Sequence, residues 1–152
     1  MKALKMTLGF IILSFCLFTT SCKKDDVSLT DQQEAAKLIN GAWGDAQVLS
    51  SPVAGATGTL TNLVLTFDIS DDLQPSTFIA SGAPEYFPSE TTWSWVGATE
   101  AVEILLDGSL PVTAITLDVL TATNMTIGFS LNGPVGGRIN GIGEYTLSFT
   151  KQ

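Results

Sequence analysis

The sequence predicts an all-β domain of about eight antiparallel strands, arranged as an up-and-down barrel behind one short N-terminal helix. From Trp43 onward, apolar residues alternate with polar ones at a period of two, which is typical of strands with one buried face. Turn residues such as Asp107-Gly108 and Asn132-Gly133 separate the short apolar segments. Short connections between neighbours favour a meander, and closing the meander into a barrel removes its exposed edges. A β-sandwich is the alternative arrangement of the same strands.

The helix is expected from Asp31 to Asn40, directly before the first strand. Thr30 or Asp31 can cap its N-terminus, Glu34 favours the first turn, and Gly41 follows as a stop signal. The strands expected after it are 43–50, 63–69, 78–80, 92–96, 102–106, 115–119, 125–130 and 145–150.

The inward faces of these strands are predicted to be apolar. We expect Val102 to point inward with Ile104 and Leu106, and Val119 to point inward with Ile115 and Leu117. An eight-stranded barrel is just wide enough to be filled by side chains or to hold one small ligand, and a ligand of this barrel should be largely apolar. The candidates to line such a chamber are Phe67, Trp93, Trp95, Leu117, Phe129 and Tyr145.

The N-terminus has the three parts of a secretory signal. Lys2 and Lys5 give a positive start, 8–18 is an uncharged apolar run, and small polar residues precede Cys22. The run is too short for a membrane span, which needs about 20 apolar residues. We therefore expect a signal peptide at 1–21, a tether at 22–30 and one folded domain at 31–152.

The Ser21-Cys22 junction resembles the lipobox of bacterial lipoproteins, in which the cysteine receives a diacylglycerol and a further acyl chain such as palmitate. Thr19 departs from that pattern, where leucine is usual. The run Cys-Lys-Lys-Asp-Asp is similar to lipoproteins of the Bacteroidota that reach the outer face of the outer membrane. The resemblance implies an exported, surface-exposed protein with lipidated Cys22. Several acyl chains on one residue give stable anchoring without a span.

Composition excludes several chemistries. Removing the signal leaves 5 basic and 15 acidic residues, a net charge of −10, which disfavours nucleic acid as a partner. The chain has no histidine, and its cysteines are Cys16, in the signal, and Cys22. The folded domain therefore lacks a thiol nucleophile, the commonest general base and the commonest transition-metal ligand. We expect no enzyme activity and no cofactor, and the sequence does not identify a protein partner.

A helix that runs into Gly41-Ala42-Trp43 at the first strand is similar to the opening of lipocalins. The resemblance implies an eight-stranded barrel with Trp43 at its closed base. It also implies an arginine stacked on that ring, for which Arg138 is the candidate. The later T-D-Y motif and the usual disulfide of lipocalins are missing, and no helix is expected after the last strand.

Two groups of acidic residues are candidate sites that the sequence pattern does not support. Asp68, Asp71 and Asp72 form an acidic loop, but its spacing does not match a calcium loop. A carboxylate pair for sugar hydrolysis could come from Glu85, Glu90, Glu100 and Glu103, yet nothing in the sequence brings two of them together.

The resulting expectation is a membrane-anchored lipocalin-like module that is not catalytic, and that either binds a small apolar ligand or serves as a scaffold. The alternative is a β-sandwich adhesion or carbohydrate-binding module at the cell surface, which requires Trp93 and Trp95 on its outer face.

Overall fold

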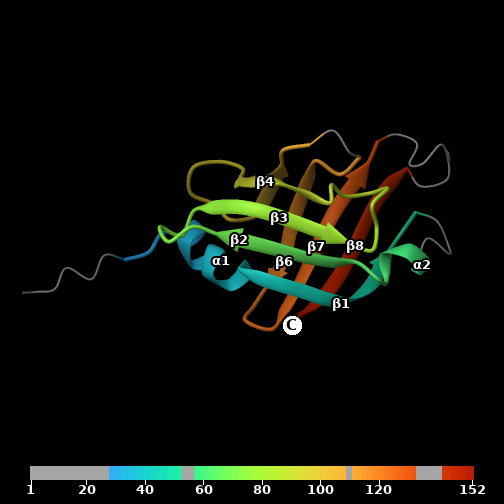
Figure 1. The fold of residues 1–152 in the computed structure, drawn as a ribbon, viewed down its shortest axis with the longest axis horizontal. Coiled ribbons are helices and arrows are strands. Elements are labelled where there is room, and N and C mark those ends of the chain that lie inside the picture. The colour runs from blue at the N-terminus through green and yellow to red at the C-terminus, as the bar shows by residue number, and fades with distance from the viewer. Residues whose placement is uncertain (1–27, 53–56, 109–110, 133–141) are drawn as a thin grey trace, which may run out of the picture.

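The computed structural model describes residues 28–52, 57–108, 111–132 and 142–152. The eight strands form one closed antiparallel barrel in sequence order, with β1 paired to both β2 and β8 (Figure 1). Their bounds are β1 Gly41–Ser50, β2 Val64–Ile69, β3 Pro75–Ser81, β4 Glu90–Trp95, β5 Glu103–Leu106, β6 Ala114–Leu120, β7 Asn124–Leu131 and β8 Gly143–Lys151. The predicted barrel is confirmed, and the sandwich alternative is wrong.

Helix α1 spans Asp31–Ile39, and its cap is Thr30 rather than Asp31. The Thr30 hydroxyl accepts from the Gln33 backbone N–H, and the Gln33 side chain accepts from the Thr30 N–H, so the two form a capping box. Gln32 donates to the backbone oxygens of Gly97 and Glu100 in the β4–β5 turn. The helix is therefore fixed to one end of the barrel, which we call the base.

The opposite end, which we call the distal end, carries the β1–β2, β3–β4 and β5–β6 connections. The first of these contains a one-turn helix, α2 Thr57–Leu60, that the sequence did not predict. Leu60, Ala83, Phe87 and Val112 from these connections are all buried in the core. The described distal connections therefore pack onto the barrel interior. Neither described helix is long and apolar enough to cross a membrane.

Two residues predicted to point inward are exposed instead. A bulge in β6 between Leu117 and Val119 shifts the register, so Val119 pairs with Thr126 and is 47% exposed. Leu120 packs against the core in its place. Val102 is 55% exposed because β5 begins only at Glu103. A strict alternation cannot foresee an extra residue in a strand.

Candidate functional site

The base of the barrel is built around Trp43. Its ring is fully buried, and its indole N–H donates to the backbone oxygen of Ile39 at 2.7 Å. Gly41 joins α1 to β1 with a φ of +113°, a conformation that residues with a Cβ rarely adopt. The spacing of glycine and tryptophan thus has a local cause: the glycine makes the sharp entry, and the tryptophan two residues later is bonded back to the helix end.

A cation lies over the Trp43 ring, and it comes from Lys151 on β8. Its ammonium nitrogen is 5.1 Å from the ring centroid and donates to the backbone oxygen of Leu38 at 2.7 Å. Burial lowers the pKa of Lys151 below its ordinary value. Arg138, the partner that the lipocalin resemblance implied, lies outside the described residues. Lys151 therefore connects the last strand, the helix end and the base tryptophan.

The six candidate lining residues all belong to the interior. Phe67, Trp93, Phe129 and Tyr145 are buried core residues, and Trp95 and Leu117 are partly buried against them. The interior placement removes Trp93 as an exposed platform for a sugar. Whether the six line a chamber or simply fill the barrel depends on how their rings contact one another.

Eight interior rings form a continuous chain joined by seven ring contacts, which we call the aromatic chain. Neighbouring ring centroids lie between 5.1 and 6.3 Å apart, and most pairs meet edge to face, although Phe129 and Tyr145 are stacked with their planes 3° apart. These are the separations of packed aromatic pairs. In order, its members are Trp95, Trp93, Phe67, Phe78, Phe87, Phe129, Tyr145 and Tyr86.

The polar atoms of this chain are held in different ways. The Trp93 indole N–H donates to the Asp68 backbone oxygen at 3.0 Å. The Trp95 indole N–H is buried and finds no partner among the described residues. Tyr145 has a raised pKa because burial and the neighbouring Tyr86 disfavour its ionised form, while a hydrogen bond with Ser51 acts in the opposite direction. The aromatic chain is apolar except at its two ends.

The acidic residues weighed in the sequence do not assemble into a metal centre. Asp71 and Asp72 are exposed in the β2–β3 turn. Glu85 and Glu90 lie at the distal end, whereas Glu100 lies in the turn that contacts α1 at the base. Within the described ranges, no group of three or more acidic, histidine or cysteine residues is arranged to hold a metal ion.

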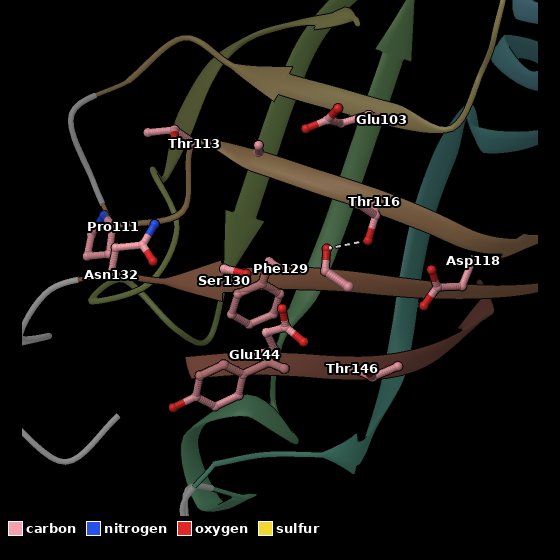
Figure 2. A pocket seen from close by; sticks show the side chains of 13 residues that line it. Glu103, Pro111, Thr113, Thr116, Asp118, Phe129, Ser130, Asn132, Glu144 and Thr146 are labelled. Atoms are coloured by element: carbon pink, nitrogen blue, oxygen red, sulfur yellow. Dashed lines mark hydrogen bonds between the residues drawn. The ribbon is translucent and has the colours of Figure 1, made fainter. Parts of the chain in front are cut away.

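A groove on the outer surface was not foreseen from the sequence. It crosses the outer face of β5 to β8 with a volume of about 380 Å³, and we call it the Gly128 groove (Figure 2). Its lining includes three carboxylates, Glu103, Asp118 and Glu144, among hydroxyl side chains. A second hollow of about 460 Å³ lies beside β4 and β5 and shares Thr113 with it. The sequence does not indicate this groove, because it marks the outward positions of these strands only as polar.

No protein-family model matches this chain, and no curated protein matches its sequence. The fold and the geometry of its two faces are therefore the basis for a functional proposal.

Proposed function

We propose that this chain is a membrane-tethered, non-catalytic lipocalin-like module whose barrel interior is a structural core rather than a ligand chamber. The aromatic chain is the observation that carries the proposal. Ligand pockets are cavities of about 300–1,000 Å³, whereas the rings at the predicted lining positions lie at packing distance from one another. An apolar guest would have to displace rings whose contacts stabilise the fold.

A non-catalytic role is supported by the side chains available. The sequence has no histidine, and both of its cysteines lie at or before position 22. The interior residues buried in the core are all apolar or aromatic. The described core therefore offers no carboxylate, imidazole or thiol that could act as a general base or nucleophile.

Binding of an apolar fluorescent probe tests the interior. We expect 1-anilinonaphthalene-8-sulfonate to show no saturable binding to the full chain under native conditions. Phe129→Ala serves as the matched positive control, because it removes a ring from the middle of the aromatic chain and leaves an apolar space. The variant should gain a binding site that the parent lacks. Saturable binding by the parent, displaced by a fatty acid, would show that the interior is a ligand chamber.

Fractionation tests the tether. Cys22→Ala should move the chain from the membrane fraction to the soluble fraction, because lipid on that thiol is the proposed anchor. Cys16→Ala is the control: it removes the other thiol within the expected signal, and the chain should remain on the membrane. Membrane attachment that survives Cys22→Ala contradicts the tether and leaves the proposal about the interior untouched.

A further inference from the structure

The Gly128 groove follows from the register of four strands. Glu103 on β5 pairs with Thr116 on β6, Thr116 pairs with Gly128 on β7, and Gly128 pairs with Thr146 on β8. Paired residues in a sheet point to the same face. The four strands therefore place one row of outward positions side by side, and that row has a glycine near its middle.

The glycine makes the floor of the groove. A Cβ on Gly128 would meet the Thr116 hydroxyl oxygen at 2.5 Å, which is closer than any ordinary contact. The Thr116 hydroxyl occupies that space and donates to the Gly128 backbone oxygen at 3.1 Å. At this point the groove therefore runs over the Gly128 backbone, toward which the Thr116 side chain inclines instead of standing up from the sheet (Figure 2).

The rim of the groove combines hydroxyl groups with carboxylates. Ser130 pairs with Glu144 beside the central row, and Asp118 is exposed at the β6 bulge. Figure 2 shows Glu103, Asp118 and Glu144 around the hollow, with Thr146 along β8. The three carboxylates come from three strands, and the described residues of the lining include no basic side chain.

One end of the groove is less polar. Pro111 and Asn132 lie together at the end opposite Asp118 in Figure 2. Phe129 and Tyr145 also border the groove, but their rings are buried in the core beneath it. The groove thus offers hydroxyl, amide and carboxylate groups along most of its length, and a proline ring at one end.

We propose that the Gly128 groove binds a saccharide without acidic groups, and binds best to one that carries an amine. A sugar ring has hydroxyls that pair with threonine, serine, asparagine and carboxylate side chains. Its C–H faces need a small apolar surface, which Pro111 provides. Three carboxylates, with no basic side chain among the described lining residues, repel an acidic sugar and attract an ammonium group. The proposal depends on neither the tether nor the packed interior.

The test is a calorimetric titration of the full chain with three trisaccharides that differ in charge. The probes are a trimer of glucosamine, maltotriose and trigalacturonic acid. We expect saturable binding of the first two, with the glucosamine trimer at least fivefold tighter, and no binding of the acidic trimer. The preference for the amine should weaken as salt is added, because exposed charges are screened.

Two variants locate the binding in the groove. Thr146→Phe places a large ring in the row beside Gly128 and should weaken both sugars more than tenfold. Thr66→Phe, the same change on the outer face of β2 and away from both hollows, is the matched control and should leave both unchanged. Thermal unfolding of each variant checks that the fold is retained.

A pair of charge variants tests the amine preference. Glu103→Gln with Glu144→Gln should reduce the ratio between the glucosamine trimer and maltotriose to about one. Asp71→Asn, a carboxylate loss in the β2–β3 turn, should keep the ratio. Three results would each overturn the proposal: no saturable binding of any trimer, equal binding of the acidic trimer, or binding that Thr146→Phe does not change.

Discussion

The two faces of strand β7 show how differently this barrel uses adjacent residues. Phe129 points inward, where it meets Phe87 edge to face and stacks on Tyr145, whereas Gly128 and Ser130 on either side of it carry the outer groove. Inside, each position is fixed by several rings that must fit together. Outside, the same backbone carries small and polar side chains. The interior therefore accounts for stability, and the outer face is where a soluble ligand can be recognised without disturbing the core.

The largest contrast between the faces is expected on strand β2. Phe67→Ala should destabilise the fold by about 3–5 kcal/mol, because it removes a fully buried ring that contacts both Phe78 and Trp93. Thr66→Ala, the adjacent outward position, should change the free energy of unfolding by less than about 1 kcal/mol. Urea denaturation of both variants measures the difference. Equal losses would mean that the interior is loosely packed.

A finer comparison uses two tryptophans on the same face of β4. Trp93→Phe loses ring volume and the hydrogen bond to Asp68, whereas Trp95→Phe loses ring volume and an indole N–H that finds no partner among the described residues. An unsatisfied buried donor costs about 1–3 kcal/mol, so its removal offsets part of the lost packing. Trp93→Phe should therefore be less stable than Trp95→Phe by about 1–2 kcal/mol in urea denaturation. The reverse order would show that Trp95 is the better satisfied of the two.

The period-two pattern was sufficient to predict the barrel because every strand keeps an apolar row facing inward. It also placed Phe67, Trp93 and Tyr145 in the interior correctly. It could not predict that Val119 faces outward, because the β6 bulge adds one residue that only the pairing with β7 reveals. The alternation of residue types specifies which face a residue takes, but a local irregularity in the hydrogen-bonded ladder can reverse it.

The outer groove was hidden from the sequence for a related reason. Glu103, Asp118 and Glu144 are far apart along the chain and become neighbours only through the register of three strand pairs. Nothing in the spacing of polar residues reports that register, because any outward residue satisfies the pattern. Similarly, the cation over Trp43 came from Lys151, whose position at the end of β8 relative to α1 depends on closure of the barrel.

The smallest expected effect concerns Tyr145, where the aromatic chain becomes polar, and it appears only at alkaline pH. Burial and the nearby Tyr86 raise the pKa of Tyr145, so the fold favours its neutral form. This stabilisation is complete below the ordinary tyrosine pKa of about 10 and is lost as pH rises through the folded-state pKa. Lys151 acts in the opposite direction, because its lowered pKa makes its own contribution rise with pH as it approaches the ordinary lysine value.

Tyr145→Phe isolates the tyrosine contribution while Lys151 stays in place. At pH 8 the variant should be less stable than the parent by about 1 kcal/mol, because it loses the hydrogen bond with Ser51. Above pH 10 the Tyr145 phenol ionises in the unfolded parent but stays neutral in the fold, which lowers the free energy of unfolding of the parent. The variant has no phenol at this position. The difference in stability between the two should therefore narrow, and the parent should lose stability more steeply with pH. Urea midpoints at pH 8 and pH 11 measure both slopes. A gap that stays constant would show that the Tyr145 hydroxyl is solvated in the fold, and would place the polar end of the aromatic chain outside the core.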